Sequence, residues 1–266
     1  YQGGAGLTIL RELNVPFTGH PPSGSGAYAV DQGALHTFPA GFLSLLTTGL
    51  LRWPEKIELA RLLGSFHKLQ SESLQHLTVQ EWLTRTVKGS KVRHVLQALF
   101  RVTSYANAPD AYSAGTAIAQ AQAALAKNVL YLDGGWQTLV DGLRSVAERA
   151  GVIIEAKQRV AAVEHDTAVR GVRLADGSLL SANSVIITGS PEETVSLIPK
   201  APTHLLTWAR TVIPIKAACL DIGLSLLPQP HARFALGIDQ PLYFSVHSAV
   251  AKLGPEGSAV IHAAKY

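Results

Sequence analysis

Cysteine and methionine are the rarest residues of this 266-residue chain, since methionine is absent and cysteine occurs once. Cys219 lies in the apolar run Ala217-Ala218-Cys219-Leu220. A lone cysteine excludes a disulfide framework within the chain, and its apolar neighbours predict a buried structural thiol rather than a nucleophile. With no signal-peptide pattern at the N-terminus, the cysteine usage indicates a reducing, cytoplasmic setting.

Charge is also scarce. Charged residues make up 16% of the chain and hydrophobic residues 47%, and the net charge is +4. The 23 lysines and arginines are scattered without a basic block, which argues against nucleic-acid binding. A composition this apolar predicts that part of the surface faces another domain, a ligand or lipid.

Two kinds of functional motif are missing. The ten histidines are spread out, and pairs such as His67 and His76 lack the spacing of ligands on a helix, so no metal site is predicted. No G-x-G-x-x-G turn for a pyrophosphate is found. The run Gly3-Gly4-Ala5-Gly6 has Ile9 in place of the third glycine and no strand before it. We interpret that run as a loop.

The strongest local pattern begins in the middle of the chain. Gly134 and Gly135 precede a helix whose apolar residues keep helical spacing as far as residue 150, and Gly151 occupies a left-handed C-cap position. Apolar runs at 152–154 and 160–163 predict two strands. Residues 171–180 (GVRLADGSLL) predict a hairpin with Asp176-Gly177 at its tip. Residues 184–191 (SVIITGSP) predict a buried strand that runs into a turn.

In order and spacing, these motifs resemble the FAD-dependent oxidoreductases of the phytoene desaturase and amine oxidase type. In that family, the same helix, strands and hairpin form the second half of the flavin-binding domain. The stretch YLDGGWQTLVDGL at 131–143 is more similar to the phytoene desaturase side. The resemblance implies a mixed α/β (α+β) fold, FAD as the cofactor, and hydride transfer to the flavin from an apolar substrate, for example an isoprenoid.

The resemblance also implies cofactor contacts. Val160 matches a strand residue whose backbone meets the adenine edge, although it is equally well an ordinary core valine. Gly134 and Gly135 match the family's glycine pair, and their alternative role is a tight turn into the helix. The segment Thr188-Gly189-Ser190 resembles the strand-end turn where the chain passes the cofactor. Gly189 would permit close backbone approach there.

No catalytic side chain is identified, because in such enzymes the flavin supplies the chemistry. His247 follows the apolar stretch 243–246 and either faces a substrate or is a hydrogen-bonded histidine at a strand end. The family's dinucleotide turn and its closing glycine-rich and alanine-rich motif are not found. We therefore expect an internal fragment of a larger enzyme that binds FAD weakly or not at all.

The remaining elements follow from periodicity and turn residues. Residues 28–30 and 34–39 predict a hairpin, and residues 21–26 a linker. Residues 41–127 are helical in pattern, with a capping box at 78–81. After Pro199 the chain predicts strands at 213–222, 234–238, 243–246 and 259–262. We expect three regions: residues 1–128 in the substrate domain, 129–199 in the flavin domain, and 200–266 in the substrate-domain sheet.

The segment of residues 42–53, from Phe42 to Trp53, carries no charge before Arg52. It is too short to span a bilayer. It either dips into a membrane surface, with Arg52 and Trp53 at the interface, or forms an ordinary buried helix, and we favour the buried helix. Lipid docking would require Leu46 and Leu50 to be exposed together.

Three hypotheses on function remain open. The first is an FAD-dependent dehydrogenase or desaturase of the phytoene dehydrogenase type. The second is an amine oxidase-like flavoenzyme. The third is a non-catalytic protein that binds lipids or isoprenoids on the same fold. The sequence identifies neither the exact substrate nor the oligomeric state.

Overall fold

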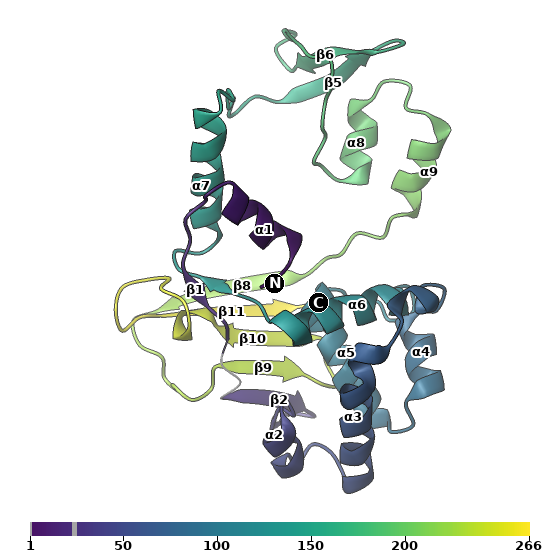
Figure 1. Ribbon diagram of the computed structural model, residues 1–266, viewed down its shortest axis with the longest axis vertical. Helices are drawn as coiled ribbons and strands as arrows, with labels where there is room; N and C mark the ends of the chain where they lie inside the picture. Colours follow the sequence, from purple (N-terminus) through teal and green to yellow (C-terminus); the bar gives the residue numbers. More distant parts are fainter. Residues whose placement is uncertain (1, 23–25) are drawn as a thin grey trace. The chain divides into compact units, whose positions relative to one another are not determined.

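The computed structural model describes residues 2–22 and 26–266 (Figure 1). Part of the predicted linker at 21–26, namely Ser23, Gly24 and Ser25, lies outside the described residues. Contacts divide the chain into two compact units, one of Tyr1–Ala147 with Ile215–Tyr266 and one of Glu148–Pro214. The mixed α/β fold is confirmed, while the assignment of chain regions to flavin and substrate domains stays a prediction.

A six-stranded sheet organises the first unit, in the order β3-β2-β9-β10-β11-β8. All neighbours are antiparallel except β2 and β9. The strands are β2 (Ala27–Asp31), β3 (Ala34–Thr37), β8 (Ala218–Leu224), β9 (Phe234–Gly237), β10 (Leu242–Val246) and β11 (Ala259–Lys265). A separate short pair joins β1 (Gly19–His20) to β4 (Tyr131–Leu132).

Most of these strands lie where the sequence predicts them. The predicted hairpin is β2–β3, and its turn residues Gln32 and Gly33 have φ of 51° and 79°, as a two-residue hairpin turn of the type I′ class requires. The strands predicted at 234–238, 243–246 and 259–262 are confirmed as β9, β10 and β11. The strand predicted from residue 213 begins only at Ala218.

Helices pack against one face of this sheet and form the main core with it (Figure 1). The core joins Ala29 and Leu236 of the sheet to Leu96 and Ile118 of the helices. The α-helices that begin in this unit are α1 (Ala5–Glu12), α2 (Phe42–Thr47), α3 (Trp53–Ser65), α4 (Val79–Thr86), α5 (Ser90–Ser104), α6 (Ala114–Lys127) and α7 (Trp136–Arg149). The 3-10 helices are η1 (Phe66–Lys68), η2 (Ser71–Leu74) and η3 (His247–Ala249).

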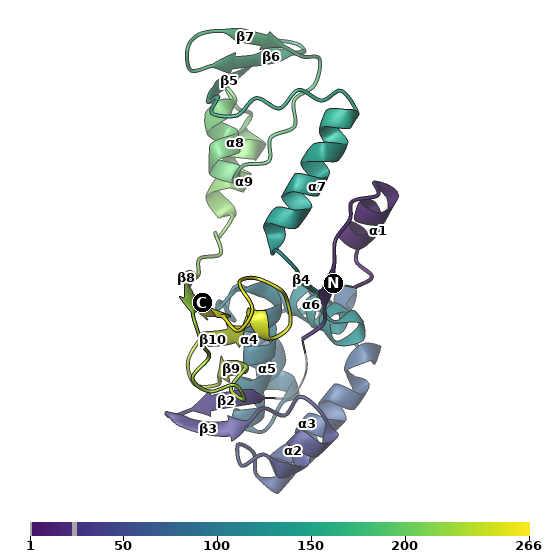
Figure 2. The same cartoon turned by 90° about the vertical axis from the view of Figure 1, so that its left-hand side faces the viewer.

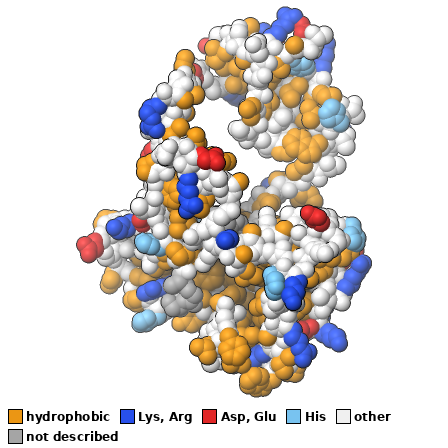
Figure 3. Space-filling model, in the orientation of Figure 1, with side chains coloured by type: hydrophobic (Ala, Val, Ile, Leu, Met, Phe, Trp, Pro, Cys, Tyr) orange, Lys and Arg blue, Asp and Glu red, His pale blue; other side chains and the backbone are white. Residues whose placement is uncertain are grey.

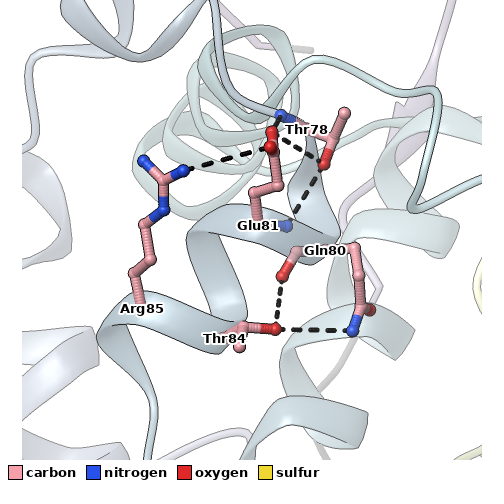
Figure 4. A network of polar contacts seen from close by, with 5 residues as sticks. All are labelled: Thr78, Gln80, Glu81, Thr84 and Arg85. Atoms are coloured by element: carbon pink, nitrogen blue, oxygen red, sulfur yellow. Dashed lines mark hydrogen bonds and ion pairs between the residues drawn. The ribbon is translucent and has the colours of Figure 1, made fainter.

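The predicted capping box is present at the start of α4 (Figure 4). The Glu81 amide donates to Thr78 Oγ1 over 3.2 Å, and the Thr78 amide donates to Glu81 Oε2 over 2.9 Å. Two backbone donors that the helix leaves unpaired are therefore satisfied reciprocally. By contrast, the loop predicted for residues 3–6 is wrong in part, since Gly4 is the N-cap of α1 and Ala5 and Gly6 are helical.

Residues 42–53 do not form one helix. Helix α2 ends at Thr47, and Thr48 Oγ1 donates to the Thr37 carbonyl over 2.6 Å, which ties the following loop to β3. Pro54 does not end a helix but lies in the first turn of α3, where its missing N–H costs nothing.

This segment is buried in part and exposed in part. Leu45, Leu50 and Leu51 are buried in the core, so the joint exposure of Leu46 and Leu50 required for lipid docking is not found. Phe42 and Leu43 are exposed by 74% and 76%. Hydrophobic side chains gather over α2 and α3 at the lower end of Figure 3. No helix among the described residues is both long and apolar enough to cross a membrane.

The second unit contains a three-stranded antiparallel sheet in the order β5-β6-β7 (Figure 2). Its elements are β5 (Val160–His165), β6 (Val169–Leu174), β7 (Leu179–Ser181), α8 (Pro191–Leu197) and α9 (Thr203–Thr211). Helix α8 packs against β5 and against α9. The predicted hairpin is confirmed as β6–β7, with Gly177 at φ 89° in its turn.

Two predictions in the second unit are wrong. Residues 152–154 and 184–188 belong to no strand, and Ile153 and Ile186 are exposed by 82% and 90%. Short apolar runs predict buried strands only where neighbouring strands pair with them, and no described residue does so here. Helix α9, which lies between Pro199 and the strand predicted from residue 213, was not predicted from the sequence.

Candidate functional site

Gly134 and Gly135 form the turn that leads into α7. Both have positive φ, 72° and 70°, a conformation that glycine adopts without strain. The Gly134 amide donates to the Lys252 carbonyl over 2.8 Å, and Asp133 Oδ1 accepts from the Lys252 amide over 2.7 Å. The bond from the Lys252 amide is the main cause that holds the pKa of the Asp133 carboxyl below its ordinary value. The glycine pair thus forms an anchored turn, and its contact with a cofactor stays a prediction.

Val160 begins β5 in the second unit. It pairs with Leu174 of β6 and precedes an irregularity in the register at Ala162. Because β5 is an edge strand of its sheet, one row of its backbone N–H and C=O groups faces away from β6. The predicted contact with an adenine edge needs backbone groups of this kind, and it stays a prediction for Val160.

Thr188, Gly189 and Ser190 are exposed and lead into α8. Ser190 caps that helix, because its Oγ accepts from the Glu193 amide over 3.2 Å and its own amide donates to Glu193 Oε2 over 2.7 Å. A Cβ at Gly189 would lie 3.0 Å from Glu193 Oε2. This helix was not predicted from the sequence, although Ser190 and Glu193 have capping-box spacing.

The structure therefore divides the predicted cofactor residues between two units. Gly134 and Gly135 belong to the first unit. Val160 and the segment Thr188-Gly189-Ser190 belong to the second. Within the second unit, helix α8 connects the segment at 188–190 to the strand of Val160, because Ser190 caps α8 and α8 packs against β5.

A shallow apolar pocket of about 390 Å³ lies on one face of the six-stranded sheet. Apart from Tyr243 and Ala264, which belong to the helical core, its strand residues alternate along the strands and share the face opposite to that core. They include Val30 of β2, Ala235 of β9, Phe244 of β10, Ala263 of β11 and Leu220 of β8. Lys265 is the one charged residue in its lining. This surface suits an apolar ligand.

A cluster of tyrosines and histidines lies on the other face, toward the β8 edge. His247 Nε2 lies 3.2 Å from the Tyr243 hydroxyl, and the Tyr131 ring packs 4.6 Å from the His247 ring. The Tyr131 hydroxyl lies 3.4 Å from Ser245 Oγ. The His247 ring stacks on His262 with centroids 5.3 Å apart. The cluster thus joins β4, β10, η3 and β11.

An aspartate completes this cluster at the sheet edge. Asp221 of β8 lies directly opposite His262 of β11, and its Oδ1 lies 2.5 Å from His262 Nδ1. The Asp221 side chain is 70% exposed and that of His262 is 20% exposed. Asp221 and His262 form what we call the Asp–His dyad, and with Tyr131, Tyr243, Ser245 and His247 they make the Tyr–His cluster.

Burial controls the protonation of this cluster. It lowers the pKa of His247, with the neighbouring His262 adding to the effect. It also raises the pKa of Tyr243 far above its ordinary value, with Tyr131 contributing. Near neutral pH, His247 is therefore uncharged and Tyr243 keeps its phenolic proton. The Tyr243 hydroxyl and His247 Nε2 are therefore two uncharged hydrogen-bond partners.

Of the Tyr–His cluster, only His247 was a candidate from the sequence. His247 is hydrogen-bonded at the end of β10, as one of its two interpretations had it, and it also stacks on a second histidine. The Asp221–His262 pair depends on the register between β8 and β11, which are not consecutive in the chain. Cys219, expected to be buried, is exposed on β8. No group of three potential metal ligands occurs among residues 2–22 and 26–266.

Residues 7–211 match the family of flavin containing amine oxidoreductases. The chain belongs to this family. Membership implies a flavin cofactor and supports the resemblance at the level of the superfamily, though not its phytoene desaturase branch. No curated protein sequence matches the chain.

Solved structures share the fold at low sequence identity. An oxidoreductase from Methanosarcina mazei is 15% identical with a TM-score of 0.76, and the match covers 99% of this chain and 64% of that one. A redesigned putrescine oxidase is 11% identical with a TM-score of 0.70, covering 97% and 61%. A Rab GDI from Plasmodium falciparum is 13% identical with a TM-score of 0.58, covering 99% and 64%. The chain thus spans less than two thirds of each relative.

Proposed function

We propose that this chain is part of an FAD-dependent oxidoreductase that oxidises an apolar substrate. The family match supports the flavin. The apolar pocket on the sheet supports an apolar substrate, because Val30, Leu220 and Phe244 offer hydrocarbon surface with few polar groups. When bound, FAD would accept a hydride from the substrate, while the sheet orients the substrate and excludes water from it.

The residues predicted to hold FAD fit this proposal. The free edge of β5 at Val160 offers backbone hydrogen bonds to an adenine edge. The turn at Gly189 has no side chain of its own and permits close approach of a cofactor. In addition, the exposed apolar segments at 152–154 and 184–188 have the composition of buried strands. We infer that further sequence of the protein covers them and completes the flavin domain.

Anaerobic reduction of the full-length protein tests the substrate class. We expect phytoene in detergent micelles, or another long apolar substrate, to bleach the oxidised-flavin absorbance. Leu220→Asp places a charge in the apolar pocket and should weaken substrate binding at least tenfold. Leu226→Asp is the matched control, because Leu226 is also exposed but lies outside that pocket. Equal effects of the two variants would argue against the pocket as the substrate surface.

The finer choice within the family is also a proposal. The stretch at 131–143 favours a phytoene dehydrogenase-like enzyme, whereas the Tyr–His cluster offers polar groups of use to an amine oxidase-like enzyme. A non-catalytic lipid- or isoprenoid-binding protein is the alternative, and the fold shared with a Rab GDI supports it. A full-length protein that binds isoprenoids yet contains no flavin would favour this alternative.

A further inference from the structure

The apolar pocket on the six-stranded sheet carries a cation at the end where β11 finishes. Lys265, the last residue of β11, is exposed and is the one charged residue in the pocket lining. The residues directly opposite it on the neighbouring strands are Leu242 of β10 and Ala218 of β8. Neither of them offers a carboxylate for a cross-strand ion pair. Lys265 is therefore surrounded by hydrocarbon groups at the edge of the pocket.

The Lys265 ammonium group also lacks a counter-ion elsewhere. Its Nζ forms no ion pair and no hydrogen bond with any residue that the structure describes. The carboxylates on the described strands of this sheet are Asp31 of β2 and Asp221 of β8. Each follows a pocket residue in the sequence, Val30 or Leu220, and therefore points to the opposite face. The pocket face thus holds a positive charge without a negative one.

The rest of the pocket provides apolar contact at a distance from this charge. Lys265 on β11 and Val30 on β2 lie three strands apart in the sheet. With about 4.8 Å between neighbouring strands, the pocket reaches on the order of 14 Å across the sheet. Ala235, Phe244 and Ala263 lie between its two ends. A ligand that fills the pocket therefore contacts hydrocarbon along its length and a cation at one end.

The charge affects which ligands bind well. A ligand that covers the pocket removes water from around Lys265. A pure hydrocarbon offers no hydrogen bond in exchange, so the ammonium group either loses hydration or turns toward solvent. A ligand with an anionic end replaces the lost water with a charge-assisted hydrogen bond. The pocket therefore favours an apolar chain that carries a negative charge at one end.

We propose that the substrate is an amphiphile, an apolar chain that ends in a carboxylate, and that Lys265 binds this carboxylate. The proposal rests on the proposed function, because it takes the pocket as the substrate surface. Lys265 holds the end of the chain that is not oxidised, and so determines in which direction the chain lies across the sheet. No bond to Lys265 forms or breaks, which makes it a residue for specificity and not for catalysis.

Calorimetric titration of the full-length protein with octanoate and with octan-1-ol tests this proposal. The two ligands share the same carbon chain and differ in charge. We expect octanoate to bind about tenfold more tightly at low ionic strength, and this difference to shrink as salt screens the ion pair. Lys265→Gln should weaken octanoate binding to the level of octan-1-ol, whereas Lys265→Arg should keep the difference. Lys68→Gln, at an exposed lysine outside the pocket, is the matched control and should change neither affinity.

The outcomes separate this proposal from the proposed function. Equal binding of the two ligands, or a preference for octanoate that survives Lys265→Gln, would overturn the carboxylate contact. Leu220→Asp should weaken octan-1-ol, whose binding depends on apolar contact. If it does so while Lys265→Gln leaves octanoate unchanged, the pocket stands and the anionic end is disproved. If Leu220→Asp leaves octan-1-ol unchanged, the pocket is not the binding surface and both proposals about it fail.

Discussion

Single side chains decide where helices of this protein begin, and α4 is the clearest case. Thr78 and Glu81 satisfy each other's backbone amides, and Arg85 adds an ion pair 3.9 Å from Glu81 (Figure 4). Thr78→Ala should lower the free energy of unfolding by about 1 kcal/mol, as the loss of an N-cap usually does. Thr86→Ala, exposed at the other end of α4, should change it by less than about 0.5 kcal/mol. Urea denaturation measures both.

The Thr78–Glu81 pair also predicts that the stability of the fold depends on pH. Hydrogen bonds from Thr78 hold the pKa of Glu81 below its ordinary value. A carboxyl whose folded pKa is depressed stabilises the fold above its unfolded pKa, and that stabilisation is lost as the pH falls through the folded pKa. Glu81→Gln should therefore destabilise the protein at neutral pH and flatten its loss of stability below about pH 4.5. If the free energy of unfolding of the unmodified protein and that of the Glu81→Gln variant differ by the same amount at every pH, this prediction is contradicted.

Residue patterns in the sequence predict those features that depend on local chemistry. The turns at Gln32-Gly33 and Asp176-Gly177 and the cap at Thr78 follow from the conformations that those residues favour. The Asp221–His262 pair does not, because 41 positions separate its members. Only the register of β8 against β11 brings them together.

At the scale of elements, α2 combines a buried face with an exposed one. Leu45 is buried, whereas Phe42 and Leu43 are exposed. Trp53 at the start of α3 is exposed too, and Lys56 Nζ lies 5.1 Å from the centroid of its ring. Aromatic residues next to cations suit a membrane interface, so peripheral membrane contact stays a proposal for this segment.

Paired variants separate membrane contact from packing. Phe42→Asp with Leu43→Asp should abolish flotation of the full-length protein with anionic liposomes, while the melting temperature changes by less than about 2 °C. Leu45→Asp places a charge in the core and should cost several kcal/mol, so it serves as the control for packing. Flotation that survives the double substitution would remove the membrane proposal.

Elements were predicted best where one face of the element is buried within its own unit. Strands β9, β10 and β11 lie where their apolar residues indicate, because the helical core covers them. The segments at 152–154 and 184–188 show the same apolar signal without a paired neighbour among the described residues. The periodicity of apolar residues predicts that a side chain is buried, but it does not identify the element that covers that side chain.

At the scale of the molecule, the two units contain different features expected of a flavoenzyme. The first carries the apolar pocket and the Tyr–His cluster, and the second carries the edge strand predicted to meet adenine. Neither unit shows a strand, G-x-G-x-x-G turn and helix for the pyrophosphate among the described residues. Calorimetric titration of residues 1–266 should therefore show FAD binding weaker than micromolar. Submicromolar affinity would contradict this account of cofactor binding.

The absorbance spectrum of the purified full-length protein tests the central claim most directly. We predict the bands of an oxidised flavin at close to one equivalent per chain, released as FAD on denaturation and bleached anaerobically by an apolar substrate. A folded full-length protein that shows no flavin bands, and takes up none when FAD is added, would contradict the assignment as a flavin-dependent oxidoreductase.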